Sequence, residues 1–128
     1  MEGSVDLYPQ LAVPQPSPSV LAQKRALIPW TKQEIEEFHR LEIVLRRAGV
    51  NSEFEHNYAD EGDPWCLVCR QGSGAVLAHF ARIDDIYIAD WVRLPQALRT
   101  NQLREAIDRF LEVALHSGRR QARYQHRH

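Results

Sequence analysis

The chain has 128 residues, of which 44% are hydrophobic, 26% charged and 9% aromatic, close to the composition of an ordinary soluble domain. The chain has sixteen basic and seventeen acidic residues. The resulting net charge of −1 gives no overall electrostatic field that would attract nucleic acid or an anionic membrane. No stretch approaches the ~18 apolar residues that span a bilayer, and the first residues lack the basic start and apolar run of a signal peptide. We therefore expect one cytoplasmic domain that binds no membrane and needs no cofactor.

Residues 1–28 hold prolines at positions 9, 14, 16 and 18 and show neither a helical nor a strand period. Alternating prolines favour an extended polyproline II conformation, which can dock on aromatic grooves of partner proteins. We expect this segment to be a Pro-rich tail outside the fold. The predicted domain covers residues 29–117, and residues 118–128 form a second tail rich in arginine and histidine.

The first predicted element is a helix over about residues 32–48. Thr31 and Glu34 have the Thr-x-x-Glu spacing of a capping box, and Gly49 supplies a C-terminal stop. Trp30 is expected to pack on Ile35 as a hydrophobic staple. The buried stripe of this helix is predicted to consist of Ile35, Phe38, Leu41, Leu45 and Ala48.

The hydrophobic period then changes to two. Alternation from Val50 to Tyr58 predicts a strand with one buried and one solvated face. Residues 60–64 form a turn, and residues 65–69 are apolar on both faces, which suits a central strand. Short connections to residues 75–81 and 86–89 predict hairpins, and therefore a meander of three or four antiparallel strands.

A helical period returns from Leu94. Pro95 suits a first helical turn, Thr100 or Asn101 is expected to cap the main helix, and Gly118 to end it. The fold class is α+β, with an N-terminal helix, a three- to four-stranded antiparallel meander and a C-terminal helix packed on one sheet face. The buried stripe of the second helix is predicted to be Leu103, Ile107, Phe110 and Ala114.

Residues with catalytic potential are few. Cys66 and Cys69 match the Cys-x-x-Cys spacing of thioredoxins, in which the motif begins a helix. Here the residues around the cysteines favour a strand. Residues three apart on a strand point to opposite faces, so the two thiols are poorly placed to form a disulfide. We expect structural cysteines, no catalytic residue and no metal site. An enzyme that uses His79 with Asp63 or Asp84 stays an alternative, since these residue types occur without a recognisable spacing.

The middle of the chain carries a pattern over roughly residues 50–90. It consists of Asp60-Glu61-Gly62-Asp63-Pro64-Trp65, Cys69-Arg70, His79-Phe80-Ala81-Arg82-Ile83-Asp84 and Tyr87. This pattern resembles one that recurs in alphaproteobacterial proteins of no known activity. The resemblance implies a bacterial intracellular domain and indicates no reaction.

Two surfaces are candidates for binding. One is the acidic turn at residues 60–63 with its neighbours, namely Asp60, Glu61, Asp63, Trp65, Arg70 and Arg82. A purely structural turn, held by surface ion pairs that contribute only ~0–1 kcal/mol each, is the other interpretation. The second surface is the C-terminal tail, where arginines suit phosphates and a tyrosine suits base stacking; it comprises Arg119, Arg120, Arg123, Tyr124 and Arg127.

We expect a small, non-enzymatic bacterial module that acts through contacts with an unknown protein partner. A nucleic-acid-associated protein that uses the arginine-rich tail is the alternative. Pairing of an outer strand, such as residues 86–89 or 54–58, would support a homodimer.

Overall fold

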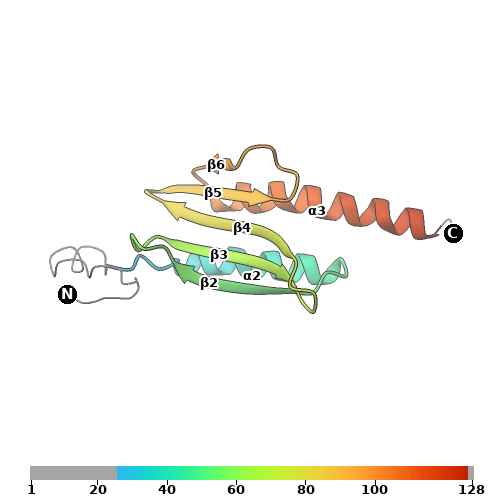
Figure 1. The fold of residues 1–128 in the computed structure, drawn as a ribbon, viewed down its shortest axis with the longest axis horizontal. Coiled ribbons are helices and arrows are strands. Elements are labelled where there is room, and N and C mark those ends of the chain that lie inside the picture. The colour runs from blue at the N-terminus through green and yellow to red at the C-terminus, as the bar shows by residue number, and fades with distance from the viewer. Residues whose placement is uncertain (1–25, 127–128) are drawn as a thin grey trace, which may run out of the picture.

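The computed structural model describes the backbone of residues 26–126 and the side chains of residues 26–116 (Figure 1). Residues 1–25, which make up most of the predicted Pro-rich tail, and residues 127–128 lie outside the described part. The elements are α2 (Lys32–Arg47), β2 (Ser52–Tyr58), β3 (Pro64–Arg70), β4 (Val76–Ile83), β5 (Ile86–Trp91), β6 (Leu98–Thr100) and α3 (Leu103–His126).

The five strands form one antiparallel sheet in the order β2-β3-β4-β5-β6. The α+β class and the meander are confirmed, but the predicted three or four strands are too few. The missing strand is β6, which pairs with β5 where the sequence predicted the start of a helix. The prediction of residues 86–89 as an outer strand is therefore wrong, because β5 lies between β4 and β6, whereas residues 54–58 belong to the edge strand β2. The helical period before Thr100 is too short to sustain a helix beside Pro95, and Leu98 instead packs against the core.

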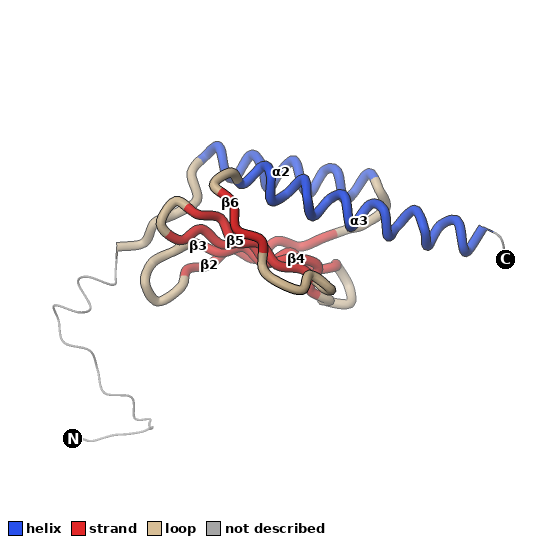
Figure 2. Tube along the Cα trace, turned by 90° about the horizontal axis from the view of Figure 1, so that it is seen from above, coloured by secondary structure: helices blue, strands red, loops and turns tan. Residues whose placement is uncertain are grey.

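The structure has two layers. Figure 2 shows both helices on the same side of the sheet; α2 contacts β2, α3 contacts β5 and β6, and the helices contact each other. The predicted packing of the C-terminal helix on one sheet face is therefore confirmed. The described part of the chain places no element on the other side of the sheet, which we call the open face.

Aromatic rings fill the space between the layers. The Phe38 ring centroid lies 4.9 Å from that of Trp30 and 5.8 Å from that of Phe80, and Phe80 lies 6.2 Å from Phe110. All four side chains are buried. Edge-to-face contacts at these distances add to the free energy of burying the rings, so this chain of rings joins both helices to the centre of the sheet.

The buried stripe of α2 differs from the prediction at both ends. At its C-terminal end Ala48 caps the helix and is exposed. In the first turn, Ile35 is 52% exposed, so it neither lies in the core nor staples Trp30. The buried residue of that turn is Glu34, which continues the stripe of Phe38 and Leu41 at helical spacing. A carboxylate takes an apolar position here because partners on the sheet satisfy its charge, as described below.

The second helix is longer than predicted. Its backbone continues through Gly118 to His126, so Gly118 does not end it, and the last turns extend past the sheet (Figure 2). An interior glycine costs a helix only about 1 kcal/mol relative to alanine, which the surrounding helix-forming residues can offset. Of the helices in the described range, none is long and apolar enough to cross a bilayer.

The turn between β2 and β3 holds the chain that enters α2. The Ile28 N–H donates to the Gly62 carbonyl at 2.9 Å. Gly62 has φ +96°, and a Cβ atom built on it would lie 2.4 Å from the Ala26 carbonyl oxygen. Gly72, in the β3–β4 turn, has φ +93° but open space around it. The two positions share a left-handed backbone and differ in crowding.

We predict that Gly62→Ala destabilises the fold by roughly 2–3 kcal/mol, whereas Gly72→Ala costs about 1 kcal/mol for the backbone conformation alone. Urea unfolding followed by tryptophan fluorescence measures both. Equal losses for the two variants would contradict the close approach of residue 26 to Gly62.

Candidate functional site

A cleft with a volume of about 920 Å³ lies where the first turns of α2 and α3 meet the β4–β5 hairpin. Polar side chains from all of these elements line it. They include Glu34, Glu37, Asp63, Arg82, Asp85 and Tyr87. Clefts with converging polar side chains are the usual location of ligand-binding and catalytic sites in proteins.

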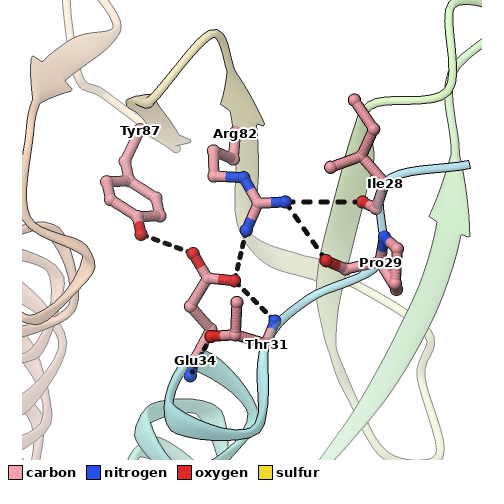
Figure 3. Close-up of polar contacts among 6 residues, drawn as sticks. All are labelled: Ile28, Pro29, Thr31, Glu34, Arg82 and Tyr87. Atoms are coloured by element: carbon pink, nitrogen blue, oxygen red, sulfur yellow. Dashed lines mark hydrogen bonds and ion pairs between the residues drawn. The ribbon is translucent and has the colours of Figure 1, made fainter.

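Glu34 is one of the residues that line the cleft, and Figure 3 shows its polar contacts. Its oxygen Oε1 accepts hydrogen bonds from the Thr31 N–H, at 2.7 Å, and from the Arg82 guanidinium. The other oxygen, Oε2, accepts from the Tyr87 hydroxyl. The predicted capping box is confirmed, because the Thr31 hydroxyl also accepts from the Glu34 N–H at 3.1 Å.

The sheet places Arg82 and Tyr87 side by side, as cross-strand partners in β4 and β5 on the helix-facing side. Arg82 also donates to the carbonyls of Pro29, at 3.1 Å, and Ile28, at 3.5 Å. Its guanidinium carbon lies 5.5 Å from the centre of the Trp30 ring, a cation–π distance. One arginine therefore ties the sheet to both α2 and the segment that precedes it.

These contacts decide the protonation states of the cluster. Burial alone would raise the pKa of Glu34, but the hydrogen bonds from Arg82, Tyr87 and Thr31 outweigh it and hold that pKa below its ordinary value. Burial and the bond to Glu34 raise the pKa of Tyr87 to about 12. Glu34 therefore stays ionised and Tyr87 protonated near neutral pH, and neither is suited to general acid–base catalysis. The cluster is a structural ion pair.

The structure brings only some of the residues predicted to form a binding surface close to the acidic turn. Asp60 and Glu61 are exposed in the β2–β3 turn, and Asp63 lines the cleft together with Arg82. The carboxylate that Arg82 actually binds is Glu34. Sequence reasoning missed Glu34 as a site residue; its capping-box position was visible, but nothing in the sequence shows that Arg82 reaches it.

The other two predicted members of the turn surface lie elsewhere. Arg70 ends β3 opposite Ser52, about six residues or ~20 Å along the strand from the turn. Trp65 is the cross-strand partner of Ala81, and both lie on the open face. The structure therefore separates the six predicted residues into the turn and cleft, the far end of β3, and the opposite side of the sheet.

His79 also lies on the open face, with its ring centroid 6.0 Å from that of Trp65. Asp63 and Asp84 line or border the cleft on the other side of the sheet. Asp84 and Asp85 form the two-residue β4–β5 hairpin turn, with φ 51° and 65°, which agrees with their prediction as turn residues. His79 therefore lies on the opposite side of the sheet from Asp63 and Asp84, the two carboxylates that the alternative enzyme hypothesis pairs with it.

The cysteines point to opposite sides of the sheet, as predicted. Cys66 is buried in the core, and burial raises the pKa of its thiol to about 12. Cys69 is half-buried on the other side, next to a β-bulge between Val68 and Cys69. Within the described residues, no three His, Cys, Asp or Glu side chains gather as a metal site would require.

Residues of the predicted nucleic-acid surface belong largely to α3. Arg119, Arg120, Arg123 and Tyr124 lie on its helical backbone, and Arg127 lies outside the described residues.

The open face differs from the usual outer side of an antiparallel sheet. On β2 it is polar, with Glu53 and Glu55, as expected of a solvated face. On the three central strands it is apolar at most positions, and Ile83 and Ile86 are 42% and 37% exposed. The exceptions include the cross-strand pair His79 and Asp90, of which Asp90 is exposed. The cross-strand register assigns it the following central residues: Trp65, Leu67, Cys69, His79, Ala81, Ile83, Ile86, Ile88 and Asp90.

Comparison with known proteins finds no matching family model, curated protein or solved structure. The candidate sites therefore rest on the geometry of this chain.

We predict that Glu34→Gln lowers the free energy of unfolding by about 3 kcal/mol, because it leaves the Arg82 charge buried without its counterion. Glu36→Gln, an exposed change on the same helix, should stay within about 0.5 kcal/mol of the wild type. Chemical denaturation measures both. Equal stabilities for the two variants would show that the buried pair contributes nothing.

The contribution of Glu34 should also depend on pH. Because its pKa is lower in the folded than in the unfolded chain, the stabilisation is present above the unfolded pKa and is lost as pH falls through the folded pKa. The difference in unfolding free energy between wild type and Glu34→Gln should therefore be largest near pH 7 and shrink below about pH 4.5. A difference that stays constant over this range would exclude the ionised carboxylate as its source.

Proposed function

We propose that this protein is a non-enzymatic interaction module that binds protein through the open face of its sheet. One observation carries the proposal. Most outward positions of β3, β4 and β5 are apolar, with His79 and Asp90 as the polar cross-strand pair among them, although outward positions of an antiparallel sheet are expected to be polar where only water meets them. The same side of the edge strand β2 is polar, so the departure is confined to the centre of the sheet.

The size of this surface supports the same function. Three strands at ~4.8 Å spacing and about 20 Å of strand length cover on the order of 300 Å², the size of the largest apolar patch on a typical monomer, which is often a binding site. Trp65, on the β3 side of this surface, is of a residue type enriched among interface hot spots. The predicted recognition role of Trp65 therefore remains, on the open face and apart from the acidic turn.

The cleft does not support an enzymatic function equally well. The central carboxylate, Glu34, already accepts three hydrogen bonds, and Arg82 is bound to it and to two backbone carbonyls. A ligand would have to displace contacts that hold the two layers together. The bacterial, intracellular setting implied by the sequence pattern is part of the proposal and is compatible with such a module.

Photocross-linking tests the surface directly. We predict that a photoreactive benzoylphenylalanine in place of Ile83 or Ile86 gives a discrete protein adduct on irradiation of cells that express the chain. The same residue in place of Val113, which is 46% exposed on α3, is the control for exposure and should give none. No adduct from the sheet positions, or equal adducts from all three, would contradict the proposal.

Nucleic-acid binding by the C-terminal arginines is a second candidate. The observation that favours it is the continuation of α3 to His126, which carries Arg119, Arg120 and Arg123 past the sheet on a regular helix. A helical backbone fixes the spacing of such residues and reduces the entropy lost on binding phosphates.

For this candidate, truncation after Ser117 should abolish binding to labelled DNA and RNA in fluorescence-anisotropy titrations. The wild-type affinity should fall with salt, with a slope of about −0.9 per phosphate contacted for duplex DNA. Absence of wild-type binding at low salt would eliminate this function.

A further inference from the structure

β2 forms one edge of the sheet and carries unpaired backbone groups on its outer side (Figure 1). Two hydrogen bonds at its ends show which groups these are. The Gln71 N–H donates to the Asn51 carbonyl at 2.9 Å, and the Ala59 N–H donates to the Asp63 carbonyl at 2.8 Å. Bonded pairs alternate along an antiparallel ladder, so the odd-numbered residues of β2 bond to β3. The even-numbered residues turn their N–H and C=O groups outward.

Three of these even-numbered residues have no backbone partner on the outer side in the described part of the chain. They are Ser52, Phe54 and His56, since the N–H of the fourth, Tyr58, donates to Asn57 Oδ1 at 2.8 Å. β2 contains no proline, and its pairing with β3 runs without a bulge. Prolines and bulges are two of the usual devices that stop an edge strand from accepting another strand. The backbone of this edge is therefore open to one.

A cleft of about 620 Å³ follows the edge. Its lining includes Ser52 and Phe54, whose side chains lie on the helix side of the sheet, and Glu53 and Glu55, whose side chains lie on the open face. Because residues from both sides of β2 line it, the cleft runs along the strand edge itself. It is the space that an added strand would occupy.

The side chains beside this cleft are mostly acidic. Glu53 and Glu55 are exposed, and in residues 26–116 neither forms an ion pair. Glu42 of α2 also lines the cleft, and its ion-pair partner among the same residues is His39, whose Nδ1 lies 3.8 Å away. Burial lowers the pKa of His56, so this side chain adds no positive charge at pH 7.

Arginines occur near one end of β2. Two of them, at positions 46 and 47, lie in the last turn of α2, which leads into this strand, and Arg70 is the cross-strand partner of Ser52. At the other end, the β2–β3 turn exposes Asp60 and Glu61. The acidic part of the edge therefore extends from residue 53 to the turn.

These charges distinguish between two kinds of added strand. Antiparallel pairing of β2 with the β2 of a second copy over its full length is centred on Glu55, which would lie opposite itself. Like charges directly opposite each other destabilise a strand pair. A strand with basic residues at every second position would instead meet both Glu53 and Glu55, because these carboxylates lie on the same side of the sheet.

α2 offers an apolar contact beside the same edge. Phe38 lies over β2, with its ring centroid 6.4 Å from that of Phe54 and 5.5 Å from that of His56. Ile35, three residues earlier on the same side of the helix, is 52% exposed. The residues of an added strand that lie on the helix side would cover Ile35, so apolar residues fit between the basic ones.

We propose that the outer edge of β2 is a second protein-binding surface, which accepts an extended peptide with alternating basic and apolar residues as a sixth, antiparallel strand of the sheet. The backbone groups of Ser52, Phe54 and His56 supply the pairing, and the glutamates select the basic residues. The inference goes beyond the function proposed above, because it uses the strand edge and not the apolar rows of β3, β4 and β5.

Fluorescence anisotropy tests the proposal, with the full chain titrated over about 1–500 µM into a labelled eight-residue peptide of alternating arginine and valine. Saturable binding is expected, and a peptide with glutamate in place of arginine should not bind. Glu53→Gln combined with Glu55→Gln should weaken binding at least about tenfold. Glu36→Gln combined with Glu112→Gln removes the same charge from exposed helix positions and should leave the affinity within about twofold.

Methylated peptides separate strand pairing from simple attraction between charges. Peptide residues opposite Phe54 and His56 direct their N–H groups toward β2, and in the proposed arrangement these residues are the valines. N-methylation of the valines should therefore weaken binding at least about tenfold. N-methylation of the arginines, whose N–H groups point away from β2, should weaken it less than about threefold.

The proposal is overturned if the arginine–valine peptide does not bind over this range, or if the two methylated peptides bind equally well. It is also overturned if glutamine at positions 53 and 55 has no greater effect than glutamine at positions 36 and 112. None of these measurements depends on adducts at Ile83 and Ile86, so the edge and the open face can fail separately.

Discussion

The carboxylate of Glu34 is the point at which separate parts of the chain meet. It belongs to α2, accepts from the residue that caps that helix, and binds Arg82 of β4 and Tyr87 of β5. Arg82 extends these contacts to the backbone of residues 28 and 29. A buried charge is tolerated only when its hydrogen bonds are complete, so the position of α2 on the sheet depends on this cluster. The aromatic core beneath it has no comparable directional contacts and would tolerate some sliding of the helix.

Because the Glu34 cluster lies between the sheet and the helices, the two sides of the sheet have different roles. On the helix side, the most prominent polar groups are engaged with one another, and the cleft they line is a consequence of how α2, α3 and the β4–β5 hairpin meet. On the other side, the sheet exposes a tryptophan, a histidine and several aliphatic side chains that contribute little to the core. A binding function located on the open face leaves the stabilising cluster undisturbed, whereas one in the cleft would compete with it.

The sequence identified those elements whose signals are local. The capping box located the start of α2, the alternation after Val50 located β2, and short turns predicted the hairpins. The predictions were wrong where contacts between residues far apart in the sequence determine which side chains are buried or which segments pair. Glu34, and not Ile35, is buried because Arg82 and Tyr87 donate hydrogen bonds to its carboxylate. Both partners lie about 50 positions further along the chain. Residues 98–100 became a strand because the edge of β5 was available. Residues 65–69 were read correctly as apolar on both sides, but only the structure shows that one side remains uncovered.

The most direct test of the account compares two-dimensional amide NMR spectra of the isotopically labelled full chain before and after addition of the protein that the probes at Ile83 and Ile86 capture. If recognition occurs on the open face and the cleft is structural, the shifts caused by that protein should concentrate on the central strands, at residues such as Leu67, His79 and Ile88. Shifts confined to the cleft, around Gln33, Asp85 and Gln102, would contradict the account by locating recognition at the cluster that we assign to stability.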